Sequence, residues 1–295
     1  MSTIPSIRIA PGKVALFLGA LVALVLLLGL PAPIFRHVLG HDYVRGFLPF
    51  AEQAFDLNEE SNVPTWLGSV LLLLCAIALL GVGLAERTLG RRYANHWLGL
   101  AAIFVFLSLD ETATFHERAG WALRQMFDLS GALYFGWVTI GAAFVLVVGV
   151  LYLGFLRHLP SRTRSLFILA GVVFVGGALG LELVQGNYAD LWGDEAYGRS
   201  GTRILLTYTE EVMEMAGCVI LIYATLDYLR GQIGPVQLAA TGVGTAGIEQ
   251  GGSRTWEAPH STGDRPRGST PRRRRGDGRS PAGSTPMPSS DGGRD

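Results

Sequence analysis

Six apolar segments, each long enough to cross a lipid bilayer, dominate this chain up to residue 230. A transmembrane helix needs about 20 mostly apolar residues. The segments that qualify run over residues 14–35, 66–86, 97–118, 131–156, 165–185 and 204–229. Hydrophobic residues make up 49% of the chain and charged residues only 16%, a balance typical of integral membrane proteins. The sequence therefore predicts an all-α fold, a bundle of six transmembrane helices over residues 14–230.

The two ends of the chain differ from this bundle. The first apolar segment is too long for a signal peptide, and the PAPIF that follows it is a poor cleavage site, so a retained helix is expected after a short N-terminus of residues 1–13. Residues 231–295 are rich in Gly, Pro, Ser and Arg, and such a composition predicts a disordered tail. The run Arg272 to Arg275 is a contact for anionic lipids or nucleic acid, or simply a solvated charge cluster. A formal net charge of +0 gives no reason to expect a nucleic-acid partner.

Basic residues predict the orientation in the membrane, because loops rich in Lys and Arg remain in the cytoplasm. Connections on one side carry nine basic residues, namely Arg8, Lys13, Arg87, Arg91, Arg92, Arg157, Arg162, Arg164 and Arg230. Connections on the other side carry six, namely Arg36, Arg45, Arg118, Arg124, Arg199 and Arg203. Both termini are therefore expected in the cytoplasm, and most acidic loop residues on the outer face.

Carboxylates interrupt three of the apolar segments. In FLSLDETATFHE, a continuous helix of about 100° per residue would place Asp110, Thr114 and Glu117 on one face, with Glu111 and His116 on either side. The fifth segment carries Glu182 near its outer end. The last segment, TYTEEVMEMAGC, carries a polar stripe made of Thr207, Glu210, Glu211, Glu214 and Cys218.

Burying these acids in a membrane is costly. Each intramembrane acid costs about 2.5–3.5 kcal/mol to insert, and nearby cations are too few to pair with all of them. The acids must then be protonated, lie in a hydrated cavity, or bind a metal cation. We expect one shared cavity that opens to the outer face. Its candidate metal ligands are Asp110, Glu111, Glu117, Glu182, Glu210 and Glu214, and its candidate catalytic residues are His116 and Glu211.

Simpler interpretations stay open for some of these residues. Glu117 and Glu182 fit the solvated end of a helix equally well, and an isolated His116 is more often a hydrogen-bonded residue at a helix end than a ligand. If a divalent metal is bound, a carboxylate-rich shell with at most one imidazole favours manganese, iron or magnesium over zinc. Three classes of function fit the pattern: a metal-dependent enzyme acting on a lipid or envelope substrate, a proton- or cation-coupled transporter or sensor, and a membrane scaffold with structural acids.

Three motifs resemble those of a group of uncharacterised six-span bacterial membrane proteins. They are FDLNEESNVPTW before the second segment, FLSLDETATFHE in the third and TEEVMEMAG in the sixth. The resemblance covers most of residues 40–230 and implies a location in the bacterial inner membrane, in contact with membrane lipids, but it implies no activity. There is a vaguer similarity to intramembrane metal hydrolases of the alkaline ceramidase and progestin-receptor type. Those proteins gather several histidines, whereas His116 is the only well-placed histidine here.

Overall fold

The computed structural model describes residues 10–39, 54–57 and 61–233. These residues form helices and short connections with no strand among them, so the all-α prediction is confirmed. The first three residues of the tail predicted to be disordered, 231–233, belong to a helical turn, and the rest of it, including Arg272 to Arg275, lies outside the described residues. Asn62 caps the helix that begins at Val63, because its side chain accepts a hydrogen bond of 3.1 Å from the backbone N–H of Thr65.

Six helical spans are long and apolar enough to cross a membrane, as predicted. Their main helices are α1 (Pro11–Gly29), α5 (Val63–Thr88), α6 (Ala94–Ala113), α8 (Trp137–His158), α9 (Ser161–Val175) and α12 (Gly201–Tyr228). The first span continues past Gly29 into α2 (Pro31–Leu39), and α12 continues into a short π-helical turn, η3 (Leu229–Ile233). The six-span prediction is confirmed, and most boundaries differ from the predicted ones by two to seven residues.

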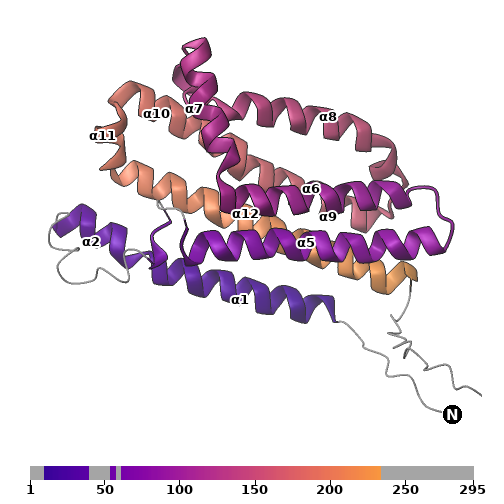
Figure 1. Cartoon of the computed structure of the whole chain (residues 1–295). Helices are drawn as coiled ribbons and strands as arrows, with labels where there is room; N and C mark the ends of the chain where they lie inside the picture. Colours follow the sequence, from indigo (N-terminus) through magenta and orange to yellow (C-terminus); the bar gives the residue numbers. More distant parts are fainter. Residues whose placement is uncertain (1–9, 40–53, 58–60, 234–295) are drawn as a thin grey trace, which may run out of the picture. The chain divides into compact units, whose positions relative to one another are not determined.

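The third span ends earlier than predicted. Helix α6 stops at Ala113, and Thr114 adopts the left-handed conformation with φ of 52°. A separate helix, α7 (Phe115–Phe127), then leaves in a new direction (Figure 1). The prediction that Asp110, Thr114 and Glu117 share one helix face is therefore wrong, because the helix is not continuous through Thr114. A β-branched residue rarely adopts this conformation, so the chain turns here at an energetic cost.

The fifth span contains a second irregularity. After α9 the chain forms a π-helical stretch, η2 (Gly176–Leu181), before it returns to α-helix in α10 (Glu182–Trp192). Short π-helical segments insert an extra residue into a helix and are often found at functional sites. A β-carbon placed on Gly177 would lie 3.0 Å from the Glu210 carbonyl oxygen and 3.2 Å from Glu214 Cγ, so the wide turn passes directly over α12.

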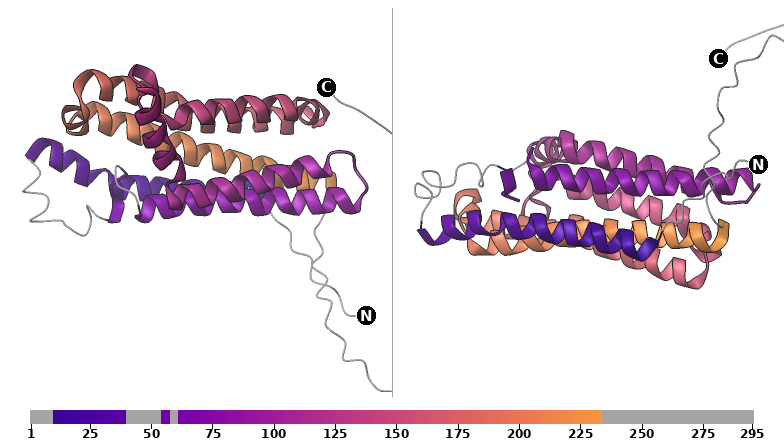
Figure 2. Two further views of the ribbon diagram at one scale, coloured as in Figure 1. Left: turned by 45° about the horizontal axis from the view of Figure 1, so that its top comes forward. Right: turned by 90° about the horizontal axis from the view of Figure 1, so that it is seen from below.

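Helix α12 lies at the centre of the bundle and packs against α1, α5, α9 and η2, while α6 packs mainly on α5 (Figures 1 and 2). Leu71, Cys75 and Leu79 of α5 are fully buried, and the Cys75 thiol lies 3.5 Å from the Cys218 carbonyl oxygen of α12. Both cysteines are free and buried. The closest approach to α9 is at Gly217, where a β-carbon would lie 2.7 Å from Phe174 Cβ.

The two ends of the bundle carry different side chains. The end where α6 stops and α12 starts holds most of the acids and is called the acidic end below. The opposite, arginine-rich end is closed by buried Glu86, which accepts hydrogen bonds from Arg91 (2.6 Å) and from the Tyr228 hydroxyl (3.2 Å). Although partial burial opposes it, the ion pair with Glu86 raises the pKa of Arg91.

Candidate functional site

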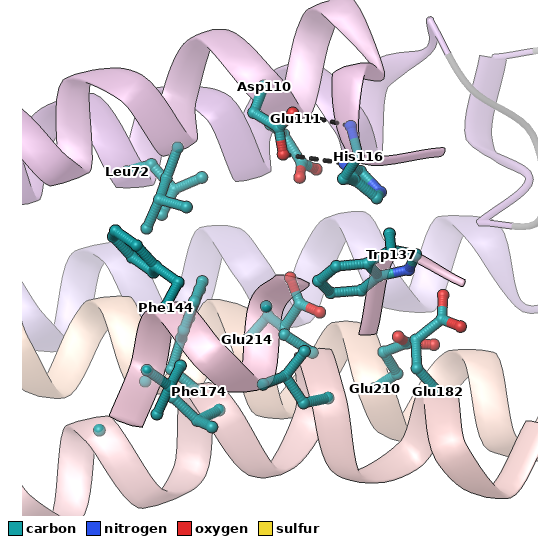
Figure 3. A pocket seen from close by; sticks show the side chains of 18 of the residues that line it. Leu72, Asp110, Glu111, His116, Trp137, Phe144, Phe174, Glu182, Glu210 and Glu214 are labelled. Atoms are coloured by element: carbon teal, nitrogen blue, oxygen red, sulfur yellow. Dashed lines mark hydrogen bonds and ion pairs between the residues drawn. The ribbon is translucent and has the colours of Figure 1, made fainter. Parts of the chain in front are cut away.

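A single cavity of about 1050 Å³ runs through the bundle between α6, α8, α9, α10 and α12. All eight site residues predicted from the sequence line it: Asp110, Glu111, His116, Glu117, Glu182, Glu210, Glu211 and Glu214. In Figure 3, Asp110 and Glu111 lie on one side of the cavity and Glu210 and Glu214 on the other. The carboxylates of three spans therefore share one space instead of facing lipid separately.

Asp110 and His116 form a close pair at the break between α6 and α7. One Asp110 oxygen accepts a hydrogen bond of 3.0 Å from the backbone N–H of His116, and the other lies 2.9 Å from His116 Nδ1. The left-handed turn at Thr114 brings these groups together, since a straight helix would place residues six apart on different faces. The His116 ring rests against Trp137, with 4.9 Å between the ring centroids.

The polar stripe of α12 faces the cavity as predicted, with Thr207, Glu210, Glu211, Glu214 and Cys218 all in its wall. A separate void of about 10 Å³ lies beside it, lined by Glu111, Glu211 and Glu214 among others. That is roughly the room that one water molecule needs. The Glu111 side chain reaches this void over Gly68, where a β-carbon would lie 2.8 Å from Glu111 Oε1.

Glu182 and Gln185 bring the fifth span into the site. The Gln185 amide donates a hydrogen bond to Glu210 and accepts bonds from the Tyr197 hydroxyl (2.9 Å) and the Thr207 hydroxyl (3.2 Å). Burial raises the pKa of Tyr197, so its hydroxyl remains a donor. Among the described residues, the Glu182 Oε2 atom is one of three buried side-chain polar atoms without a hydrogen-bond partner. A buried acceptor left in this state favours a ligand that can donate to it.

Residues between the spans cover the acidic end. The Tyr134 hydroxyl donates a hydrogen bond of 2.5 Å to Asp194, and the Arg124 guanidinium lies 3.3 Å from the centre of the Tyr134 ring. Burial, together with this hydrogen bond to Asp194, raises the pKa of Tyr134. All three side chains line the cavity. The sequence analysis did not assign them to the site because they lie in connections and carry no periodic pattern.

The rest of the cavity is apolar. Leu100, Phe104, Phe144 and Phe174 line its middle part, called the apolar arm below. Its far end is an aromatic floor made of Tyr152, Phe155 and Phe167, and the Tyr152 hydroxyl donates to the His96 carbonyl oxygen at 3.1 Å. The fourth span also contributes to this arm, because one face of α8 lines it.

The geometry does not favour a metal centre. In the part of the chain that the structure describes, no three His, Cys, Asp or Glu side chains lie close enough together to hold a metal ion. The six predicted metal ligands share the cavity but are spread along and across it. The predicted manganese, iron or magnesium site therefore gains no support from the arrangement of these side chains.

The fold and its cavity define a polytopic membrane protein with an acidic, partly apolar cavity inside the membrane-spanning region. Residues 15–229 match the domain of unknown function DUF8692, and the chain belongs to this family. No curated protein and no solved structure matches the chain. The family covers all six spans, so the cavity and the acids that line it lie within the shared domain.

Proposed function

We propose that this protein binds an amphipathic, lipid-like molecule whose head group is cationic, with the head at the acidic end of the cavity. The observation that carries the proposal is the continuity of the cavity, in which a carboxylate-rich end opens directly into an apolar arm. Sites for small molecules are usually apolar clefts with a few polar groups that fix the ligand's orientation. A volume of about 1050 Å³ is at the upper limit of their usual range of about 300–1,000 Å³.

The charge balance of the lining favours a positive head group. Eight carboxylates line the cavity, the predicted seven and Asp194, whereas the basic lining residues are His116, Arg124 and Arg203. His116 is paired with Asp110, and Arg124 is stacked on Tyr134. The acids of α12 and the partnerless oxygen of Glu182 face the same space. An ammonium group can donate three hydrogen bonds here, and Trp137 offers it an aromatic face.

Binding of radiolabelled hexadecylamine to the nanodisc-embedded protein tests this proposal, with hexadecyl sulfate and hexadecanol as matched competitors. Only the amine should compete. Glu210→Gln should weaken amine binding about tenfold or more, since a hydrogen bond to a charged group contributes about 1.5–3 kcal/mol. Glu195→Gln is the matched control, because Glu195 is an acid at the same end, outside the cavity lining and 80% exposed. Equal competition by the sulfate, or equal effects of the two variants, would refute the proposal.

A second candidate function is an enzyme that acts on the bound head group, and the Asp110–His116 pair favours it. A histidine oriented by a carboxylate through Nδ1 is a common arrangement for proton transfer, because the pair holds the ring in place and stabilises its charged form. Mass spectrometry of membrane lipid extracts incubated with the protein tests this function. New products should form with the wild-type protein and not with His116→Ala. If the two proteins leave identical extracts, the site binds without catalysing.

A further inference from the structure

Helix α8 forms one wall of the apolar arm and is tied to the other helices near its two ends. Near the acidic end, a β-carbon on Gly136 would lie 2.6 Å from the Gly120 carbonyl oxygen of α7, and one on Gly141 would lie 2.7 Å from Leu179 of η2. Near the arginine-rich end, Tyr152 bonds to His96 of α6. The cavity separates the middle of α8 from α6 and α9.

Two glycines at mid-length line this separation. Gly149 of α8 and Gly171 of α9 both belong to the cavity wall. A β-carbon at either position would meet no atom within 4 Å. The two helices run in opposite directions from the turn at Leu159 and Pro160, and the two glycines are nearly equidistant from it in sequence. They therefore lie at about the same depth, and each widens the arm by lacking a side chain.

The arm is as deep as one leaflet of a bilayer. Leu100 and Glu111 both line the cavity, and at a rise of about 1.5 Å per residue they lie about 16 Å apart along α6. The hydrocarbon core of a bilayer is about 30 Å thick, so one leaflet contributes about half of that. The aromatic floor of Tyr152, Phe155 and Phe167 closes the arm at this depth.

The apolar arm is also accessible from the side. Ile168 and Val172 of α9 line it while being 49% and 64% exposed, and Phe144 of α8 lines it while being 43% exposed. All three lie in membrane-spanning helices, where the surroundings are lipid. A chain that enters between α8 and α9 would therefore pass from lipid to an apolar wall without crossing water.

We infer that the apolar arm is a binding subsite for one hydrocarbon chain about one leaflet long, and that Gly149 and Gly171 provide the width it needs. This inference rests on the proposed binding of a cationic amphiphile and specifies its tail. A chain that enters from lipid gains little from the hydrophobic effect, because lipid tails are as apolar as the wall. Fit to the arm then decides affinity, so chains that would extend beyond the aromatic floor should bind poorly.

Binding of a series of linear amines, from decylamine to docosylamine, at equal mole fraction in nanodiscs tests the subsite. Wild-type protein should bind the shorter members similarly and lose affinity beyond one chain length. Gly149→Leu and Gly171→Leu place a branched side chain in the arm, from positions where the β-carbon itself has no atom within 4 Å. They should weaken binding of the longest accepted chain roughly tenfold, as overpacking costs about 1–3 kcal/mol, and move the limit to a shorter chain. Gly81→Leu is the matched control, because Gly81 has the same open surroundings outside the cavity lining.

The outcomes separate this inference from the proposed function. If wild-type protein binds none of the amines, the proposed function fails, and the chain subsite fails with it. If it binds amines without a length limit, or if both leucine variants behave like Gly81→Leu, the head-group site stands and the chain subsite is refuted. Thermal unfolding of each variant shows that any loss of binding comes from a folded protein.

Discussion

The close contact between α9 and α12 gives a stability prediction that can be worked from distances. A β-carbon on Gly217 of α12 would lie 2.7 Å from Phe174 Cβ, 2.9 Å from Phe174 N and 3.0 Å from its Cα. Two of these atoms are backbone, so they cannot move aside without shifting α9. Gly171, in the interior of α9, has no atom within 4 Å of the same position. Replacing each glycine with alanine adds the same methyl group, at a crowded position for Gly217 and at an open position for Gly171.

The pair of variants isolates the cost of the contact. Alanine in a helix interior is favoured over glycine by about 0.8–1.0 kcal/mol, and this gain applies to both positions. Overpacking costs about 1–3 kcal/mol and applies only to Gly217→Ala. The free energy of unfolding of Gly217→Ala should therefore be about 1–3 kcal/mol below that of Gly171→Ala, which should itself equal or exceed the wild-type value.

Unfolding in mixed micelles with increasing SDS, followed by far-ultraviolet circular dichroism, measures this difference. Gly177→Ala adds an intermediate case, because its β-carbon would lie 3.0 Å from the Glu210 carbonyl oxygen and from Met213 Cβ. Its stability should fall between those of the other two variants. Equal stability of Gly217→Ala and Gly171→Ala would mean that α9 and α12 do not approach as closely as described, and the reasoning would fail.

Three further predictions concern the two ends of the bundle. Asp110→Ala removes the acceptor for the backbone N–H of His116, so the first turn of α7 should lose about 1 kcal/mol and exchange its amide hydrogens faster, as seen by mass spectrometry. Glu86→Ala removes the acceptor of the buried Tyr228 hydroxyl and of the Arg91 guanidinium, and it should lower the free energy of unfolding by about 2 kcal/mol. By contrast, Glu195→Ala breaks an exposed ion pair and should change the free energy of unfolding by less than about 0.5 kcal/mol. The orientation in the membrane can be tested with single cysteines. A cysteine that replaces Glu195 should react with an impermeant maleimide in intact cells, and one that replaces Arg92 should react only after permeabilisation. The reverse pattern of labelling would show that the orientation is the opposite of the predicted one.

The six spans could be predicted because lipid imposes a length and a composition that each helix meets by itself. The acidic stripe of α12 was predictable for a similar reason, since that helix is regular through Glu210, Glu211 and Glu214. Their joint position in one cavity followed from the cost of burying charge. Where a helix keeps its period, sequence spacing gives the direction of each side chain.

The break in the third span and the role of α8 could not be predicted in this way. The stretch DETATF contains no Gly or Pro that would indicate a break at Thr114. Spacing alone therefore placed Asp110 and Glu117 on one face of a continuous helix. The hydrogen bonds of His116 to the Asp110 carboxylate that accompany the turn join residues six apart in the chain and leave no periodic pattern in the sequence. The role of α8 was also hidden, because an uncharged helix that lines an apolar cavity has the same composition as one that faces lipid.

The π-helical turn at Gly176–Leu181 divides the fifth span into two parts whose faces are set independently. A π-helical turn holds about one residue more than an α-helical turn, so the residues after it keep the direction they would have if that residue were removed. Each residue of an α-helix turns the chain by about 100°, so a continuous α-helix of the same sequence would turn Glu182 and Gln185 away from Glu210 by that angle. Deleting a single residue within the turn should therefore convert it to α-helix and leave Glu182 and Gln185 directed at Glu210. In this family, a member one residue shorter at this turn would thus keep the acidic site and lose only the wide turn over α12.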